Sequence, residues 1–400
     1  MPRSLEDKTP PWKQQATSLE IILHDTMSAI EASWRALEAW PGNFLHQRFD
    51  WCAAWAVASG NGLVLVEGRV GGNVLFILPL EIVHGRGGRT ARFIGSPHSN
   101  GNTGLFAPDW AEHLPGMATM LARRLPPLLA GRADLILFDK VPAVWGGFVQ
   151  PLAQMPSTRH QNASYQLPIL ADFEATLRQL NAGNRRRKFR VTDRKLKALG
   201  GYRHIRAQTA SEKARLLDLF FAQKATRFRA QNLPDVFADP KIQAFFHGLA
   251  AYPQGASFEI LRLDALVVDL PEGERVAAVA GLSRKGEHLL CQFSSIDDRL
   301  SQDASPGEML FHLIIEGCVG EGVTLFDFGI GDQLYKRSWC TRETVLSDVT
   351  LPITARGRAA MLAYRATVAM KTAIKRNSRL YAALQALRRR FKADDGAGAA

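Results

Sequence analysis

The sequence predicts an α/β protein made of two halves, and three observations indicate this fold class. Helical and strand-like hydrophobic patterns alternate through both halves of the chain. With 46% hydrophobic and 22% charged residues, the composition is typical of a folded globular protein. The length of 400 residues is enough for two or three ordinary domains.

The first half reads as helices followed by a mixed set of strands. Apolar residues at helical spacing, such as Trp34, Leu37 and Trp40, predict the helices, and apolar runs predict the strands. The predicted elements are helices over 28–40 and 44–57, strands over 62–67, 74–82 and 90–94, a turn-rich loop over 96–102, a helix over 110–125 and a strand over 133–138.

The second half starts near Asp172 and has a defined order of elements. Thr209 and Glu212 form a capping box, and Ser305 with Pro306 is a helix start in which Ser305 is the expected N-cap. The predicted elements are helices over 173–180 and 185–199, a strand over 202–207, helices from 209 and over 239–249, strands over 257–263, 276–283 and 288–294, a helix over 305–318 and a strand over 323–328.

Charge and cysteine content indicate which partners and which kinds of site the protein can have. The net charge is +12, and the excess of Lys and Arg lies in two segments, 185–206 and 356–392, where an anionic partner is expected to bind. The four cysteines form no CxxC pair, which argues against a zinc site or a disulfide framework and favours a reducing, cytoplasmic compartment. We expect no secretory signal and no membrane-spanning helix, because no sufficiently long apolar run occurs.

The segment 323–337 is the strongest candidate for a functional site. An apolar run to Phe328 predicts a buried strand, and two glycines then permit a close approach of backbone or ligand. A cluster of ionisable groups follows directly, as is common where strands of α/β enzymes end. A plain polar loop after an edge strand is the alternative interpretation.

These residues also carry a family resemblance. The pairs Asp327-Phe328, Gly331-Asp332 and Tyr335-Lys336 resemble a motif of the CelD/BcsL family of acetyltransferases, which are linked to bacterial cellulose and exopolysaccharide production. The resemblance covers about 173–345, with weaker similarity at 44–55, 78–80 and 95–99. One departure is Gln333, where the family usually has Glu, so the general base is left unassigned.

The resemblance implies a fold and a domain organisation. It implies the GNAT (acyl-CoA N-acyltransferase) fold, and its members resemble Fem-type transferases, in which two GNAT-like lobes lie side by side. We therefore expect a disordered tail over 1–17, an N-terminal GNAT-like lobe over 18–168, an acetyltransferase lobe over 169–354, a basic amphipathic helix over 355–393 and a disordered tail over 394–400.

The resemblance also implies acetyl-CoA as the acyl donor, with no metal. In GNAT proteins two central strands splay apart to take the pantetheine arm, and the pyrophosphate sits at the N-terminus of the next helix. The expected cofactor-binding residues are Gln292, Phe293, Ser294, Ser305 and Gly307. The usual glycine-rich phosphate loop is absent, Pro306 removes a donor and Glu308 adds negative charge, so a plain capped helix is the alternative.

Proton transfer and acceptor binding are assigned to the groups around the motif. Lys336 is a candidate to bind an acceptor phosphate or stabilise the oxyanion, Tyr335 to protonate the leaving thiolate, and Asp332 to take a proton. An ion pair that orders the loop is the alternative role for Asp332. Residues expected to bind the acceptor are Arg187, Arg190 and Arg337.

The sequence thus predicts an acyltransferase that acetylates a hydroxyl or amine of a sugar or polysaccharide precursor. A polysaccharide synthase and an anionic membrane surface, met through the C-terminal helix, are candidate partners, with the protein cytoplasmic or peripheral at the inner membrane. Nucleic acid is not expected, because no recognised module occurs. Two alternatives stay open: a Fem-like enzyme using aminoacyl-tRNA, and a non-catalytic accessory subunit.

Overall fold

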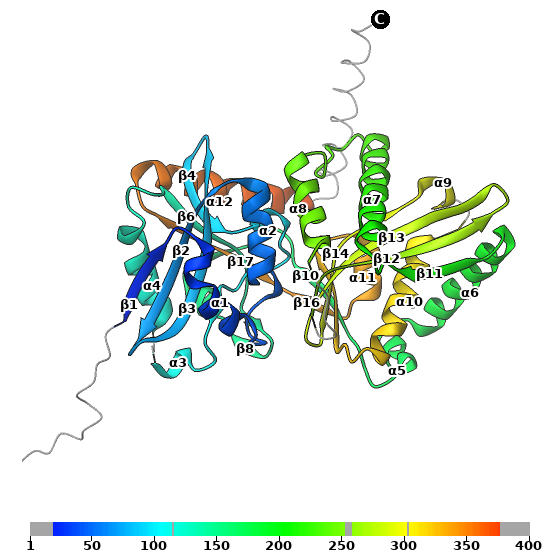
Figure 1. Ribbon diagram of the computed structural model, residues 1–400, viewed down its shortest axis with the longest axis horizontal. Helices are drawn as coiled ribbons and strands as arrows, with labels where there is room; N and C mark the ends of the chain where they lie inside the picture. Colours follow the sequence, from blue (N-terminus) through cyan, green and yellow to red (C-terminus); the bar gives the residue numbers. More distant parts are fainter. Residues whose placement is uncertain (1–18, 114–115, 253–257, 302–303, 377–400) are drawn as a thin grey trace, which may run out of the picture.

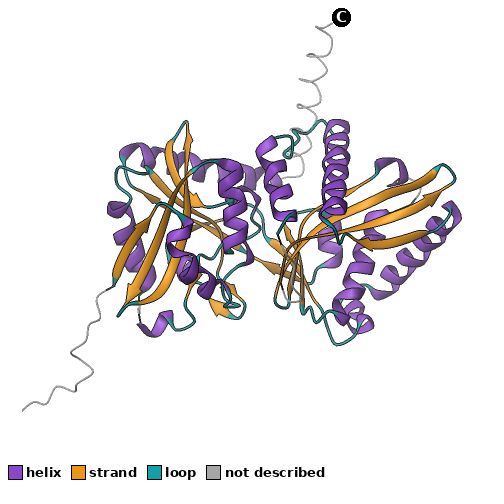
Figure 2. Ribbon diagram, in the orientation of Figure 1, coloured by secondary structure: helices purple, strands orange, loops and turns teal. Residues whose placement is uncertain are grey.

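The computed structural model shows two lobes side by side, each with a mixed β-sheet covered by helices (Figures 1 and 2). The structure describes residues 19–113, 116–252, 258–301 and 304–376, so both predicted tails lie outside the described residues. The α/β fold with two lobes, predicted from the alternating hydrophobic patterns, is confirmed.

The sheet of the first lobe follows the order β1-β2-β3-β4-β6-β17-β9, with β5 paired to β3. Its strands are antiparallel except for β4 and β6, which run parallel. Its strand bounds are β1 Glu20–His24, β2 Gly62–Val70, β3 Asn73–Gly85, β4 Gly88–Phe93, β5 Leu105–Phe106, β6 Leu135–Pro142, β9 Ser157–Arg159 and β17 Leu346–Pro352, and a separate hairpin joins β7 Val144–Trp145 to β8 Phe148–Val149.

Helices pack on this sheet through their apolar faces. Trp34 and Trp51, both fully buried, anchor α1 and α2, and Gly60 ends α2 in a left-handed conformation that suits glycine. The helices of this lobe are η2 Met27–Ile30, α1 Glu31–Glu38, η3 Leu45–Gln47, α2 Phe49–Ser59, η4 Ser96–His98, α3 Trp110–His113, α4 Met117–Leu128, η5 Pro151–Gln154 and α12 Ala355–Arg376.

The sheet of the second lobe follows the order β11-β12-β13-β14-β15-β10-β16. Here β14 and β15 are the parallel pair, and the other neighbours are antiparallel. Its strands are β10 Ser164–Pro168, β11 Tyr202–Arg206, β12 Phe258–Leu270, β13 Gly273–Lys285, β14 His288–Ile296, β15 Leu325–Ile330 and β16 Arg342–Thr344.

Helices cover both faces of the second sheet, with α6 and α10 on one face and α7 on the other (Figure 1). The capping box predicted at Thr209 and Glu212 is present and opens α7. The helices of this lobe are α5 Phe173–Arg178, α6 Ala182–Leu199, α7 Ala210–Ala230, α8 Pro240–Ala250, α9 Asp298–Ser301, α10 Pro306–Gly320 and α11 Leu334–Trp339.

The two sheets repeat one arrangement and exchange a strand. In each lobe three antiparallel strands lead through a helix, α4 or α10, to a strand that runs parallel to the third. In each sheet, the strand beside that parallel strand comes from a different part of the chain. β17 follows the second lobe in sequence but pairs with β6 in the first sheet. β10 precedes the second lobe and pairs with β15 in the second sheet. The predicted boundaries therefore differ from the structure, because 164–168 lies in the second sheet and 346–352 in the first.

A continuous apolar core joins the lobes. Trp51 and Trp55 of α2 contact Phe245 of α8 edge-on, with ring centroids 4.9 and 5.3 Å apart. The cluster continues through α7 to Phe293 of β14. Because the same hydrophobic cluster contains residues of both sheets, the lobes are held together by burial of apolar surface.

The C-terminal helix docks on the first lobe over its described length. The Tyr364 hydroxyl donates to Asp348 Oδ2 at 2.9 Å, and Arg365 donates to the hydroxyl of Thr350 at the same distance. The remainder of the predicted helix, 377–393, lies outside the described residues. No helix within the described ranges has the length and apolarity needed to cross a bilayer.

Candidate active site

Two parallel strands separate in the middle of the second sheet. β14 and β15 are paired only where 288–290 lies beside 325–327, and the rest of each strand has no partner across the gap. A β-bulge falls at the same point, since the register with β13 shifts between Cys291 and Phe293. Bulges redirect side chains and are common beside active sites. The free edge of β14 from Cys291 to Ile296 is therefore open to a ligand that pairs with backbone groups.

The bulge sends the neighbouring predicted cofactor residues in different directions. The Gln292 side chain faces the first lobe, where its Oε1 lies 3.0 Å from His46 Nε2. The Phe293 ring stacks on Phe220 of α7 at 4.1 Å. Ser294 stays half-buried at the free edge and hydrogen bonds with Tyr335. Only Ser294 presents its side chain at the gap, so any contact of the other two with a donor would use their backbone.

The predicted pyrophosphate position lies at the start of α10. Ser305 is the N-cap residue of α10 and Pro306 begins the helix, as predicted, but the Ser305 side chain is exposed and makes no capping hydrogen bond. A Cβ placed on Gly307 would lie 3.0 Å from Ile296 of β14, which puts this helix start against the far end of the free edge. Because Ser305 caps nothing, the first N–H groups of α10 keep their capacity to bind an anion.

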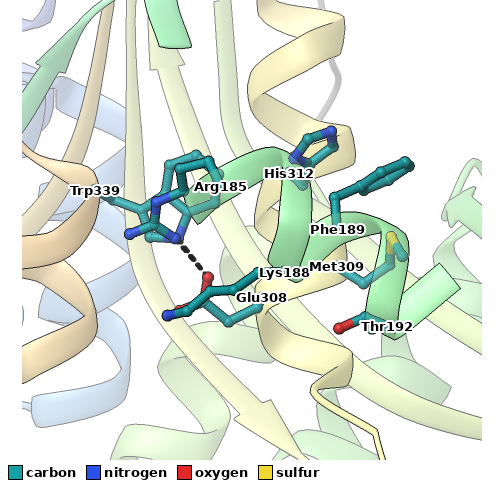
Figure 3. A pocket seen from close by; sticks show the side chains of 8 residues that line it. All are labelled: Arg185, Lys188, Phe189, Thr192, Glu308, Met309, His312 and Trp339. Carbon is teal, nitrogen blue, oxygen red and sulfur yellow. Dashed lines mark hydrogen bonds and ion pairs between the residues drawn. The ribbon is translucent and has the colours of Figure 1, made fainter. Parts of the chain in front are cut away.

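The negative charge of Glu308 is neutralised within the fold, as Figure 3 shows. Arg185 of α6 donates to Glu308 Oε2 at 2.6 Å, and Trp339 Nε1 donates to the same oxygen at 3.1 Å. The Arg185 guanidinium also lies 3.9 Å from the centroid of the Trp339 ring. This arrangement removes the objection that Glu308 would repel phosphate, and it ties α6, α10 and α11 together.

The predicted catalytic residues occupy two different environments. Tyr335 and Lys336 lie on the inner side of α11: the Tyr335 ring is stacked near Phe311, and burial raises the pKa of Tyr335 well above its ordinary value. Lys336 is buried, donates to the carbonyl of Ile330 at 2.6 Å, and has a pKa lowered by that burial. Asp332 is solvent-exposed and pairs with Arg337 at 2.5 Å, an arrangement that orders the loop.

Sequence reasoning missed Lys224 of α7 and Cys291 of β14. Burial is the main cause that lowers the pKa of Lys224 to about 8, and repulsion from Arg227 and Lys336 adds to it. Burial raises the pKa of the Cys291 thiol to about 12, although the charges of Lys336 and Lys224 oppose the shift, so the thiol stays protonated at neutral pH. No motif marks Lys224, because its position depends on how α7 packs over β14.

Asp327, the first acidic residue of the motif, is buried and holds two strands together. Asp327 is fully buried; burial alone would raise its pKa, but contacts with His288, Gln166 and the Gly329 N–H lower it instead. Ser164 and Gln166 of β10 donate to its two oxygens at 2.9 and 2.8 Å. Asp327 thus links β15 to β10 at the last position where β15 is still paired with β14.

The predicted acceptor-binding arginines are solvent-exposed. Arg187 and Arg190 lie on the outer surface of α6, and Arg337 lies beside Asp332. The structure does not bring Arg187 and Arg190 to the gap between β14 and β15. The residue of α6 that contacts α10 is Arg185. No group of three metal-binding side chains occurs in the described ranges.

Comparison with known proteins agrees with this geometry. Residues 183–337 match the family model described as an acetyltransferase (GNAT) domain. That segment contains the gap, α10 and the Tyr335-Lys336 pair. Residues 183–337 therefore resemble a GNAT acetyltransferase domain. The match supports an acyltransferase, as predicted from the motif.

Two solved structures share the two-lobed fold. FemX is 12% identical, with a TM-score of 0.58, and the match covers 86% of this chain and 99% of that chain. The structure of L-PGS from Bacillus licheniformis is 8% identical, with a TM-score of 0.50, and the match covers 87% of this chain and 98% of that chain. No curated protein matches the chain. The predicted pair of GNAT-like lobes is confirmed at the level of fold.

Proposed function

We propose that the protein transfers an acetyl or other acyl group from acyl-CoA to a hydroxyl or amine of a sugar-type acceptor in exopolysaccharide biosynthesis. The observation that carries the donor assignment is the free edge of β14, which runs from Cys291 to the start of α10 with Tyr335 and Lys336 beside it. The sugar-type acceptor is supported by the CelD/BcsL-like motif around Asp327 and Lys336.

The residues fit a thioester donor chemically. Backbone groups of β14 would pair with the pantetheine amides, and the Gly307 N–H and the dipole of α10 would receive the pyrophosphate. The donor supplies an activated carbonyl whose C–S bond breaks as the bond to the acceptor forms. The positive charge of Lys336, with the charge of Lys224 close enough to interact with it, would stabilise the oxyanion, and Tyr335 would give its proton to the departing sulfur.

The acceptor's proton requires a base that the motif does not supply. Position 333 is Gln, and Asp332 is held by Arg337 at the surface. A hydroxyl or amine that attacks the thioester would release its proton to Asp332 only after that ion pair opens, or to water. We retain Asp332 as the proposed base, because it follows directly after β15 and the Tyr165 hydroxyl of the adjacent strand β10 donates to it at 3.4 Å.

An aminoacyl-tRNA donor is the second candidate. The exposed basic surface of α6, which includes Arg187 and Arg190, supports it, because polyanions are attracted to such a surface. The weak phosphate site at Pro306 supports it as well, because an aminoacyl ester needs no pyrophosphate cradle. The fold shared with FemX is compatible with either donor.

Peripheral membrane contact is part of the proposal. α12 exposes Leu362 and Met370 on its outer side, with Lys371 beside Met370 and Arg358 one turn before Leu362. Exposed apolar residues flanked by cations suit an anionic bilayer surface. Co-sedimentation with anionic vesicles at low salt should be reduced by Leu362→Ser with Met370→Ser, and equal sedimentation of the two proteins would contradict this contact.

The donor is identified by a competition experiment. Purified protein is incubated with labelled acetyl-CoA or with charged total tRNA and a panel of nucleotide sugars, and transfer of label is measured. We expect label from acetyl-CoA on a sugar, with Lys336→Ala inactive and Lys371→Ala, an exposed lysine of the C-terminal helix, as the matched control. Transfer from tRNA alone would favour the second candidate.

A further inference from the structure

A single side chain of the first lobe bridges the two strands where they separate. Asn100 Oδ1 accepts a hydrogen bond from Ile330 N of β15 at 3.0 Å, and its Nδ2 donates to Gln292 Oε1 of β14 at 3.2 Å. We propose that Asn100 is a positioning residue for acyl transfer: it fixes the separation of β14 and β15, so that the donor site of the second lobe is completed by the first.

The loop that carries Asn100 is held in place by hydrogen bonds with Lys140 and Asp139 of the first lobe. The Lys140 ammonium donates to the carbonyls of Ser96 and Ser99, and Asp139 Oδ1 accepts from the Ser96 hydroxyl at 2.6 Å. Lys140 is buried and has a left-handed backbone (φ 57°), which is strained for a residue other than glycine. A strained, buried lysine that holds two loop carbonyls indicates that the position of Asn100 is specified rather than incidental.

The second lobe is shaped to receive this side chain. Gly329 has φ 70°, and a Cβ at this position would lie 2.4 Å from Asn100 Oδ1, closer than any real contact. Two features therefore favour glycine at position 329: the left-handed backbone conformation and the close approach of the Asn100 side chain. This accounts for the first glycine of the Phe328-Gly329-Ile330-Gly331 motif.

His46 supports the bridge from its other side. Asn100 N donates to His46 Nδ1 at 3.3 Å, while His46 Nε2 lies 3.0 Å from Gln292 Oε1. Gln292 then donates to the Ser283 hydroxyl of β13 at 3.0 Å. The polar chain thus runs from the first lobe through the bulge of β14 into the next strand, and His46, Asn100 and Ser283 are buried while Gln292 is half-buried.

Ile330 connects Asn100 to Lys336, the proposed catalytic lysine. Its N–H is bound by Asn100 and its carbonyl accepts from Lys336 at 2.6 Å. A shift of Ile330 would therefore move the ammonium that we assign to the oxyanion. Small displacements of a catalytic group cost rate disproportionately, so the bridge positions both the strand edge and Lys336; this consequence rests on the proposed function.

The test measures structure and binding separately. Amide hydrogen exchange at Ile330 and the Kd for acetyl-CoA are compared in the full chain for wild type, Asn100→Ala and Asn100→Asp. The matched control is Asn43→Ala, a fully buried asparagine whose three side-chain hydrogen bonds stay within the first lobe. Gly329→Ala disturbs the same contact from the second lobe.

We expect Asn100→Ala to exchange the Ile330 amide at least tenfold faster and to weaken acetyl-CoA binding about tenfold, as expected for loss of one well-formed hydrogen bond at each strand. Asn100→Asp keeps the acceptor for Ile330 and should retain its protection while binding weakens. Unchanged exchange in Asn100→Ala, or equal effects in Asn43→Ala, would overturn the proposal. If wild type does not bind acetyl-CoA but exchange at Ile330 still responds, the bridge stands and the proposed function fails.

Discussion

Burial of His46 makes the contact between the lobes sensitive to acid. The ring is fully buried, and that burial is the main cause that lowers its pKa to about 3, while its hydrogen bond with Gln292 opposes the shift. The folded protein therefore keeps His46 neutral between about pH 3 and pH 6.5, whereas the unfolded chain takes up a proton there. Because the unfolded state binds more protons in this window, the free energy of unfolding falls as pH falls.

The magnitude follows from these two pKa values. Each pH unit below 6.5 costs about 1.4 kcal/mol, so the contribution of His46 between pH 7 and pH 5 is about 2 kcal/mol. His46→Gln keeps a donor toward Gln292 but cannot titrate. Urea unfolding followed by tryptophan fluorescence at both pH values should show a loss from pH 7 to pH 5 that is smaller by this amount in the variant.

His98 and His312, whose pKa values burial lowers to about 4, contribute equally to both proteins and cancel in the comparison. The charges that act on His98 are those of Lys140, Arg92 and Asp239, and those that act on His312 are Arg185 and Glu174. An equal loss of stability in wild type and His46→Gln would refute the reasoning, because it would mean that His46 has the same affinity for protons in the folded and unfolded states.

Three further outcomes are expected. Lys336→Met should lower kcat by 10² to 10³, about the cost of one oxyanion donor, in steady-state assays and without loss of thermal stability; a normal kcat would remove Lys336 from the site. Lys224→Met should abolish a fall in rate as pH rises through about 8, where the Lys224 ammonium loses its proton; an unchanged pH profile would exclude Lys224. Arg185→Met should destabilise the protein by about 3 kcal/mol because Glu308 loses its cation, and adding Glu308→Gln should recover much of the loss in urea melts; no recovery would show that packing on Trp339 dominates.

The second lobe could be predicted closely from the sequence because its signals are local. The order of strands and helices, the capping box at Thr209 and the strand before Gly329 all follow from periodicity and turn chemistry. The strand exchange could not be predicted, because 164–168 and 346–352 are short runs whose partners are set by tertiary packing rather than by their own pattern.

The candidate site divides in the same way. Tyr335 and Lys336 follow a recognisable motif, and the structure places both beside the gap between β14 and β15. Lys224, Asn100 and the Arg185–Glu308 pair have no motif, since each is brought there by an element distant in sequence. The β-bulge at position 292, which accompanies the contact of Gln292 with the first lobe, has no sequence signature here.

Calorimetric titration of acetyl-CoA into the purified protein, beside Gly307→Trp and Lys336→Ala, tests the central claim most directly. We predict saturable binding by wild type, loss of binding in Gly307→Trp because the indole would fill the space between α10 and Ile296, and retained binding in Lys336→Ala. Absence of binding by the wild-type protein, or equal binding by Gly307→Trp, would contradict a donor site along the free edge of β14.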